Sequence, residues 1–360
     1  MFVLSKTGHA KLDIIAGHAL IRTSLVTTIS ASISFDDDGV RYGCLRVPHS
    51  VHDSAYGHIP IPLAVAKRGS GPTVLLTGGV HGDEYEGPIA LYSLMRQLEQ
   101  MPLSGRLIII PSINQPAFLA GARVSPIDNL NMNRCFPGSS SGSVTQMIAN
   151  YVASELIPLA SYAFDMHSGG SSLQYLPILL APQWHDGTKR GAIVGLVEAF
   201  SPTLVAYFDS LKAVDGDDRV FGKVANKYGC HFLTGEFGGG SSVNLDGLAM
   251  LKSGLGRVLH HVGLIGEPSD SARPTSSTRH LSLQDPGLFA FSPVNGIFEP
   301  SYRLGDELPA NSVAGWIYDP VAPWNPPMEV RFKSGGLAVC IRTFARVKPG
   351  DCLGHLAKDI

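Results

Sequence analysis

Short apolar runs alternate with segments of helical period between Thr73 and about Val262. A run of about four to eight apolar residues predicts a buried strand, whereas apolar residues that recur every three or four positions predict a helix with one buried face. Strands are expected at residues 74–79, 106–114, 162–167, 177–182, 203–208 and 230–237. This alternation is typical of an α/β fold, in which helices cover a largely parallel or mixed sheet.

Two helices of this segment are marked by their residue patterns. Pro88 suits a first helical turn, because the backbone N–H groups of that turn have no acceptor within the helix and a proline therefore loses no hydrogen bond there. Apolar residues then recur on one face of the predicted helix, at Ile89, Leu91, Leu94, Met95 and Leu98. We expect this helix to pack on the sheet, and a last helix is expected at 245–262.

The composition changes after Gly266. The segment EPSDSARPTSSTR is rich in Pro, Ser and Thr and has no apolar period, which predicts a linker between domains. From about Ser282, short β-like pieces are separated by Gly, Pro and Asp turns, which predicts a small all-β domain. We therefore divide the chain into an N-terminal extension (1–35), a large α/β domain (36–265), a linker (266–281) and a C-terminal β domain (282–360).

Two phrases of the C-terminal domain, GIFEPSYRLGDELPANSVAGWIYD and ARVKPGDCLGHLA, resemble the half-motifs of a lipoyl- or biotinyl-type β sandwich. A carrier domain of that type needs a modifiable Lys at its hairpin tip. This sequence has Pro326-Pro327-Met328-Glu329 there. We therefore expect this domain to act as a lid or in oligomerisation rather than as an acyl carrier.

The composition is that of a well-packed globular protein, with 44% hydrophobic and 16% charged residues. The 28 Lys and Arg residues nearly balance the 30 Asp and Glu residues, and no basic stripe is present, so nucleic acid is not expected as a partner. The five cysteines are scattered with no C-x-x-C pair, which favours reduced thiols and a cytoplasmic location. Charged residues interrupt the apolar stretch at 12–33, so neither a membrane nor a signal peptide is expected.

The motif HGDEYEG directly follows the predicted strand 74–79 and places His81 and Glu84 three residues apart. Residues three apart on a first helical turn face the same way, so both side chains can reach one cation. Loops at the carboxyl ends of strands are also where open α/β sheets bind ligands. Taken alone, such a pair is more often a surface His and an exposed Glu at a helix start, so further ligands are needed.

His167 supplies the third ligand, in the motif DMHSGG at the end of another predicted strand. A catalytic zinc takes three protein ligands and keeps a fourth position open for water, and two His with one Glu is such a set. One zinc ion is therefore predicted at these three residues. Asp165 lies two residues earlier on the same face of the strand, where its carboxylate can orient the ligating imidazole.

Three further motifs contain candidate catalytic and substrate-binding residues. Glu236 is the last residue of a predicted strand, in the motif GEFGGG. A carboxylate there can take a proton from an activated water and transfer it to a leaving amine. The alternative is that Glu236 is a solvent-exposed charge at the end of a strand. NMNRCFPG contains Asn133 and Arg134, and a guanidinium binds a carboxylate through two parallel hydrogen bonds. Arg123, in AGARVSP, is available to polarise the scissile carbonyl, or it forms an ordinary surface salt bridge.

Taken in order, HGDEYEG, NRCFPG, DMHSGG and GEFGGG resemble the succinylglutamate desuccinylase/aspartoacylase family of zinc hydrolases, relatives of the zinc carboxypeptidases. The resemblance implies a carboxypeptidase-like mixed sheet flanked by helices, with residues 36–265 as the catalytic domain. The site residues that it implies are the zinc ligands His81, Glu84 and His167, the catalytic residues Glu236 and Arg123, and the substrate-binding residues Asn133, Arg134 and Arg123.

Two longer stretches narrow the expected substrate. FDDDGVRYGCLRVPHSVHDSAYGHIPIPLAVAKRGSGPTVLLTGGVHGDEYEGPIAL and ARVSPIDNLNMNRCFPG are similar to the N-alpha-acetyl-L-2,4-diaminobutyrate deacetylases of ectoine breakdown. Asp128 and Glu86 are acidic and close to the motifs, so either could bind the side-chain ammonium group of the substrate. In the preferred interpretation both are solvated charges of loops. The stretch before Phe35 and the long linker differ from that group, which leaves open a paralogue acting on another acyl-amino acid.

Two other functions would use the same residues. A zinc carboxypeptidase acting on peptides shares every ligand but needs an open groove for several residues. A metal-bound binding protein would keep the ligands without turnover, but it has no need of a base at Glu236. We therefore expect a small N-acyl amino acid as the partner of this chain, and a homo-oligomer is left open.

Overall fold

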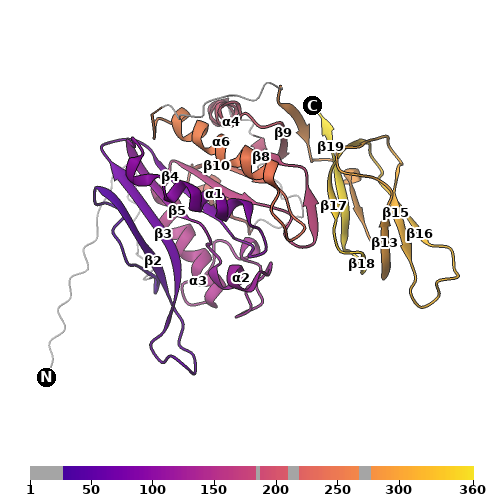
Figure 1. The fold of residues 1–360 in the computed structure, drawn as a ribbon, viewed down its shortest axis with the longest axis horizontal. Helices are drawn as coiled ribbons and strands as arrows, with labels where there is room; N and C mark the ends of the chain where they lie inside the picture. Colours follow the sequence, from indigo (N-terminus) through magenta and orange to yellow (C-terminus); the bar gives the residue numbers. More distant parts are fainter. Residues whose placement is uncertain (1–26, 184–186, 210–218, 267–276) are drawn as a thin grey trace.

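The computed structural model describes residues 27–183, 187–209, 219–266 and 277–360. A large mixed sheet with helices on both faces forms the body of the molecule, and a small antiparallel sheet of C-terminal residues lies at one end of it (Figure 1). The predicted mixed α/β fold with a separate C-terminal β part is therefore confirmed. The lipoyl-type likeness of that part stays a prediction.

The large sheet contains 15 strands within the described ranges. They are β1 Ser30–Ala31, β2 Gly39–Pro48, β3 His58–Arg68, β4 Thr73–Gly78, β5 Gly105–Ile110, β6 Tyr162–His167, β7 Leu173–Tyr175, β8 Ile178–Gln183, β9 Leu204–Asp209, β10 His231–Glu236, β11 Arg279–Ser282, β12 Phe289–Phe291, β14 Glu307–Leu308, β17 Gly336–Arg342 and β19 Cys352–Asp359. Their order is β1-β2-β3-β5-β4-β6-β10-β8-β9-β11-β19-β17-β14, with β12 paired to β19 and β7 to β17. At the centre β5, β4, β6 and β10 are parallel, and antiparallel β3 and β8 flank them.

The central strands are buried on both faces, which accounts for their unbroken apolar sequences. Leu75 and Leu76 of β4 enter hydrophobic clusters on opposite faces of the sheet, and Ile108 and Ile109 of β5 do the same. Successive residues of a strand point to opposite faces, so one continuous run of apolar residues supplies both layers of the core.

Helices cover each face of the sheet. On one face α1 Glu86–Met95, α4 Gly187–Phe200 and α6 Leu245–His261 share an apolar cluster with the strands, and on the other face α3 Val144–Tyr151 and α5 Phe221–Lys227 do so. Figure 1 labels α1, α3, α4 and α6 among them. The shorter helices are η1 Leu98–Gln100, α2 Gln115–Ala120, η2 Met132–Arg134, η3 Val152–Leu156, η4 Ile157–Leu159 and η5 Pro286–Leu288. No helix in the described part of the chain is long and apolar enough to cross a membrane.

The C-terminal residues form a second core that is joined to the large sheet. The small sheet has the order β16-β15-β13-β18, from β16 Met328–Arg331, β15 Val313–Tyr318, β13 Gly296–Pro300 and β18 Arg346–Val347. Phe298 and Ile317 of this sheet pack in one cluster with Leu353 and Leu356 of β19. Because β19 also pairs with β11, and β11 with β9, the C-terminal strands continue the sheet of the α/β part.

The predicted domain division stays a prediction, and the structure describes only part of its boundaries. Residues 1–26 of the predicted N-terminal extension lie outside the described residues, and the remainder contains β1, which pairs with β2. Residues 267–276 of the predicted linker also lie outside them. The end of that linker forms most of β11, so the large sheet begins again before Ser282.

Two local differences from the sequence-based expectation bear on the site. The strand predicted at 106–114 ends at Ile110, because Pro111 has no N–H for the sheet and Asn114 is already the N-cap of α2. His81 and Glu84 do not lie on a first helical turn as predicted. They lie in the turn between β4 and α1, which begins only at Glu86.

Candidate active site

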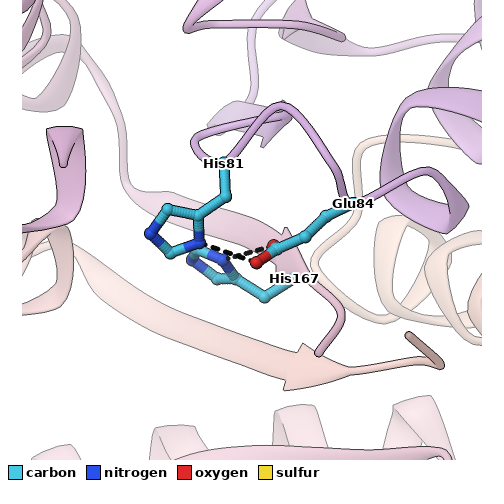
Figure 2. A group of neighbouring side chains, drawn as sticks. All are labelled: His81, Glu84 and His167. Atoms are coloured by element: carbon cyan, nitrogen blue, oxygen red, sulfur yellow. Dashed lines mark hydrogen bonds and ion pairs between the residues drawn. The ribbon is translucent and has the colours of Figure 1, made fainter. Parts of the chain in front are cut away.

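The three predicted metal ligands come together at one edge of the sheet (Figure 2). His81 and Glu84 follow β4, and His167 is the last residue of β6, which is the parallel neighbour of β4. Parallel strands present their carboxyl ends at the same edge, so two segments 83 residues apart in the chain meet there. One ligand atom from each residue lies within 4.8 Å of the others, and all three side chains are buried.

Both imidazoles are oriented by a second hydrogen bond. The Nδ1 atoms of His81 and His167 lie 2.7 and 2.9 Å from the two carboxylate oxygens of Glu84 (Figure 2). On the opposite side of the rings, His81 Nε2 lies 3.0 Å from Asn131 Oδ1, and His167 Nε2 lies 2.8 Å from Asp165 Oδ2. Asn131 Oδ1 and Asp165 Oδ2 only accept, so each Nε2 carries a hydrogen, and each Nδ1, which faces the Glu84 carboxylate, is the atom that would coordinate a metal after releasing any proton it holds.

The predicted role of Asp165 as a partner of His167 therefore has a geometric basis. Asp165 is fully buried, and its other carboxylate oxygen accepts a hydrogen bond from the hydroxyl of Thr77 at 2.7 Å. Asn131, which the sequence reasoning missed, has the same function for His81. Its Oδ1 also accepts the N–H of Asn133 at 3.0 Å, which fixes the orientation of the amide.

The buried charges of the cluster are strongly coupled. Burial opposes the ionised form of Glu84, but His81 and His167 outweigh it and hold the pKa of Glu84 well below its usual range. Burial also opposes a charge on His167, yet the carboxylates of Asp165 and Glu84 raise its pKa well above the ordinary value. Burial lowers the pKa of His81. The cluster therefore offers an ionised carboxylate and a neutral imidazole as ligands.

Glu236 ends β10, directly beside His167 in the parallel register of β10 and β6. Its Oε2 atom is buried and has no hydrogen-bond partner among the described residues. Burial, reinforced by the charge of Glu84, raises the pKa of Glu236 to about 8. A carboxyl group with this pKa exchanges a proton near neutral pH, which is the property of a general acid–base residue.

The other predicted residues line the same pocket of about 350 Å³. Arg123 Nη1 lies 3.4 Å from His81 Nδ1 and 3.6 Å from Glu84 Oε1, so the guanidinium is next to the ligand atoms. Asn133 Oδ1 accepts the N–H of Phe221 at 3.0 Å, which ties its loop to α5. Arg134 Nη1 donates to the carbonyl of Asn133 at 2.7 Å.

The preferred interpretation of Asp128 and Glu86 as solvated loop charges is wrong. Glu86 is fully buried, and its carboxylate accepts the N–H of Asn244 at 2.8 Å and the hydroxyl of Ser168. Asp128 accepts both the N–H and the hydroxyl of Thr145, each at 2.8 Å. Buried or partly buried carboxylates need such partners, and these partners make both residues structural ties between loops.

C-terminal residues also reach this pocket, which the sequence reasoning did not foresee. Leu283, Phe289, Val339 and His355 line it together with Tyr175 of β7. The predicted role of the C-terminal domain was a lid or an oligomer contact, whereas its strands contribute part of the pocket wall. No local pattern around His355 indicates this position, because it follows from long-range strand pairing.

Comparison with known proteins places this arrangement in a family. A family model described as the succinylglutamate desuccinylase/aspartoacylase catalytic domain matches residues 70–262 of the chain, the segment that carries all three predicted ligands and Glu236. The chain belongs to the succinylglutamate desuccinylase/aspartoacylase family. This is a family of deacylases, so the predicted family is confirmed and the chain is a hydrolase in its general class.

Individual relatives within the family are similar over almost the whole chain. It is 35% identical over 332 residues to the N-alpha-acetyl-L-2,4-diaminobutyric acid deacetylase of Halomonas elongata, covering 92% of this chain and 95% of that protein. The product-bound ectoine utilization protein EutE (DoeB) of Ruegeria pomeroyi has a TM-score of 0.86 and 37% identity, covering 92% of this chain and 99% of that one. A succinylglutamate desuccinylase/aspartoacylase of Rhodobacter sphaeroides has a TM-score of 0.85 and 35% identity over the same shares.

Proposed function

We propose that this protein hydrolyses the amide bond of a small N-acyl amino acid at a zinc ion held by His81, Glu84 and His167. The observation that carries the proposal is the state of the ring nitrogens. Both imidazoles have Nε2 already hydrogen-bonded and Nδ1 directed at the Glu84 carboxylate. A pair of histidines with a merely structural role has no need of this common orientation.

The donor set fits zinc. Two imidazole nitrogens and one carboxylate oxygen are ligands that zinc accepts, and three protein ligands leave a further position for a substrate atom. The hydrogen bonds from each Nε2 are of the kind that orients metal-bound histidines. When bound there, zinc would supply a Lewis acid that polarises the acyl carbonyl and acidifies a water molecule.

Glu236 is proposed to hold and move the proton of the reaction. In its ionised form the carboxylate takes a proton from the attacking water, and in its protonated form it returns that proton to the nitrogen of the leaving amine. The free Oε2 atom in the pocket and the pKa of about 8 both support this assignment. One carboxyl group therefore serves both proton transfers.

The two arginines are proposed to bind different parts of the substrate. Arg123 lies beside the ligand atoms, where its guanidinium can stabilise the negative charge that develops on the acyl oxygen. Arg134, with Asn133, lines the pocket next to α5, where a guanidinium can bind the free carboxylate of an amino acid. This division selects substrates with a carboxylate close to the scissile amide.

We favour N-alpha-acetyl-L-2,4-diaminobutyrate as the substrate. Support comes from the 35% identity to the Halomonas elongata deacetylase and from a pocket of about 350 Å³, which suits a small molecule better than a peptide. Another N-acyl or N-succinyl amino acid is the alternative within the family. A zinc carboxypeptidase acting on peptides and a non-catalytic metal-binding protein are less well supported.

The test combines metal analysis with turnover. Wild-type protein should hold one zinc ion per chain and release acetate from N-alpha-acetyl-L-2,4-diaminobutyrate, and Glu236→Gln should lower kcat by at least about a hundredfold. Glu329→Gln is the matched control, because it changes an exposed Glu that pairs with Arg331 in the small sheet. Near wild-type acetate release by Glu236→Gln, or the lack of tightly bound zinc, would refute the mechanism. A panel of N-acetyl, N-succinyl and N-formyl amino acids and short peptides then ranks the substrates.

A further inference from the structure

A second polar group lies in the wall of the pocket, formed by residues far apart in the sequence. Tyr175 of β7 pairs in register with Cys340 of β17, Cys340 pairs with His355 of β19, and His355 pairs with Phe289 of β12. Residues directly opposite on neighbouring strands point to the same face. The small Cys340 side chain between them lets the Tyr175 hydroxyl and His355 Nε2 approach to 3.1 Å.

The other ring nitrogen of His355 is buried without a partner. His355 is only 4% exposed, and its Nδ1 atom forms no hydrogen bond with any residue in the described ranges. Buried polar atoms nearly always have a partner, because leaving one unpaired loses the hydrogen bond that it made with water. Since His355 lines the same pocket as Glu236 and the ligands, a bound molecule is the natural partner for this atom.

The surroundings of Nδ1 indicate what kind of group it binds. The rings of Phe289 and Tyr175 pack on the His355 ring at centroid distances of 4.7 and 5.3 Å, so the site is partly aromatic. Burial lowers the pKa of His355 to about 4, so the imidazole is neutral. We assign the hydrogen of the bond between His355 and Tyr175 to Nε2, with the Tyr175 oxygen as acceptor, and this tautomer has a lone pair at Nδ1. That lone pair accepts a hydrogen bond from an amine, and aromatic faces also attract a cation.

Other residues near the motifs cannot take this role as readily. Glu86 and Asp128 were the acidic residues considered for the substrate's ammonium group, and both already accept hydrogen bonds from Asn244 and Thr145. Arg123 and Arg134 carry the same sign of charge as an ammonium. Glu236 Oε2 is the other unpartnered acceptor among the described residues of this pocket, and the proposed proton transfers use it, so the wall formed by β7, β12 and β19 offers an acceptor for the side chain of the substrate.

We propose that His355, positioned by Tyr175, is the specificity-determining residue that accepts a hydrogen bond from the side-chain amine of the substrate. The inference rests on the proposed function, because it concerns the substrate of the same site. It assigns the substrate class as N-acyl amino acids whose short side chain ends in an amine. It also gives the C-terminal strands a direct part in substrate selection.

The test compares two substrates that differ only in the amine. N-alpha-acetyl-L-2,4-diaminobutyrate and N-acetyl-L-2-aminobutyrate have the same carbon chain, and the ratio of their kcat/KM values measures recognition of the amine. The ratio for the zinc-loaded wild-type enzyme is expected to exceed about ten. His355→Phe should lower this ratio by about ten- to a hundredfold, which is the range for one hydrogen bond to a charged group. The loss should fall mainly on KM for the diamine substrate.

Two further variants separate recognition from structural damage. Tyr175→Phe keeps the ring but removes the hydroxyl that orients His355, so it should lower the ratio less than His355→Phe, and the double variant should lose no more than His355→Phe alone. If His355→Phe does not fold, Tyr175→Phe decides the question. His280→Phe is the matched control, since His280 makes a similar bond to the Tyr207 hydroxyl at 3.2 Å, outside this pocket.

The outcomes distinguish the two proposals. A selective drop in the ratio for His355→Phe or Tyr175→Phe, with His280→Phe unchanged, supports the subsite. An equal loss for both substrates, or an unchanged ratio in a folded His355→Phe variant, refutes the subsite and leaves the proposed function standing, and Tyr175→Phe is used in the same way if His355→Phe does not fold. Failure of the zinc-loaded wild-type enzyme to hydrolyse either compound refutes the proposed deacetylase function and the subsite with it.

Discussion

Replacing Asp165 with Asn changes the charge behind His167 while keeping nearly the same shape. The carboxylate accepts the Nε2 hydrogen of His167 at 2.8 Å and the Thr77 hydroxyl at 2.7 Å. An Asn side chain can still accept from Nε2 through its carbonyl oxygen, provided that its NH₂ group faces Thr77. The Thr77 hydroxyl can then donate to the carbonyl of Phe164, which lies 3.4 Å away. The hydrogen bonds therefore survive, and mainly the charge is lost.

The size of the effect follows from this geometry. Loss of a partner that orients a metal-bound histidine typically weakens metal binding by about ten- to a hundredfold, or about 1.4–2.7 kcal/mol. Because Asn preserves the hydrogen bonds, Asp165→Asn should lie near the tenfold end. Asp165→Ala leaves both His167 and Thr77 without this partner and should lie near the hundredfold end.

The effect should also depend on pH, because a proton competes with the metal at His167. In the metal-free protein the carboxylates of Asp165 and Glu84 raise the pKa of His167 well above its ordinary value despite burial, so zinc must displace a proton from Nδ1. Asp165→Asn lowers that pKa and reduces the competition. The weakening caused by the variant should therefore be smaller at low pH and grow as the pH rises.

Zinc affinity is measured by competition with a chromophoric chelator at about pH 6.5 and 8.5, and proton release by calorimetry in two buffers of different ionisation enthalpy. Asp285→Asn is the matched control, since Asp285 also accepts two hydrogen bonds, from the Gly287 N–H and the Ser334 hydroxyl, in the C-terminal part. Equal zinc affinity in Asp165→Ala and Asp285→Asn would show that Asp165 does not support the metal site. A weakening by Asp165→Asn that is the same at both pH values would refute the proton-competition argument.

Two further predictions concern stability. Glu236→Gln should raise the thermal unfolding midpoint of the metal-free protein, and the increase should grow between pH 4.5 and about 8. In this range the Glu236 carboxyl group ionises in the unfolded wild-type chain but stays protonated in the folded one, which destabilises the folded wild type. Equal midpoints of the variant and the wild type in calorimetry at about pH 8 would contradict this. Gly82→Ala should abolish cooperative unfolding in urea, since its methyl group would overlap the backbone of Ala117 under the ligand turn. Gly191→Ala in α4, where the methyl meets open space, should instead stabilise by up to about 1 kcal/mol.

The proposed site residues could be predicted because each stands at the end of an apolar run or in the turn that follows one. His167 closes β6 and Glu236 closes β10, and apolar runs of this length identify buried strands without any knowledge of their partners. The rule that parallel strands end at a common edge then brings the side chains together. Only the exact turn of His81 and Glu84 was misassigned, because helix starts are weakly encoded.

The hydrogen-bond partners of the two histidines could be predicted only where they are close to them in the sequence. Asp165 is two residues from His167 on the same strand, so alternation was enough to find it. Asn131 reaches His81 across 50 residues from a loop with no period, and its neighbour Asn133 carried the more familiar pattern. Glu86 and Asp128 were misjudged for the same reason, since their hydrogen-bond partners are 158 and 17 residues away.

The sequence by itself predicted the mixed α/β architecture, the family, the three proposed ligands and the proposed role of Glu236, because strand periodicity and strand-end motifs act over a few residues. The tertiary structure alone decided which nitrogen of each imidazole faces the Glu84 carboxylate and which residues close the pocket. Tyr175 and His355 are 180 residues apart, and they meet because β7 and β19 both pair with β17. Strand pairing of that range depends on the packing of the whole sheet, so no short pattern in either segment records it.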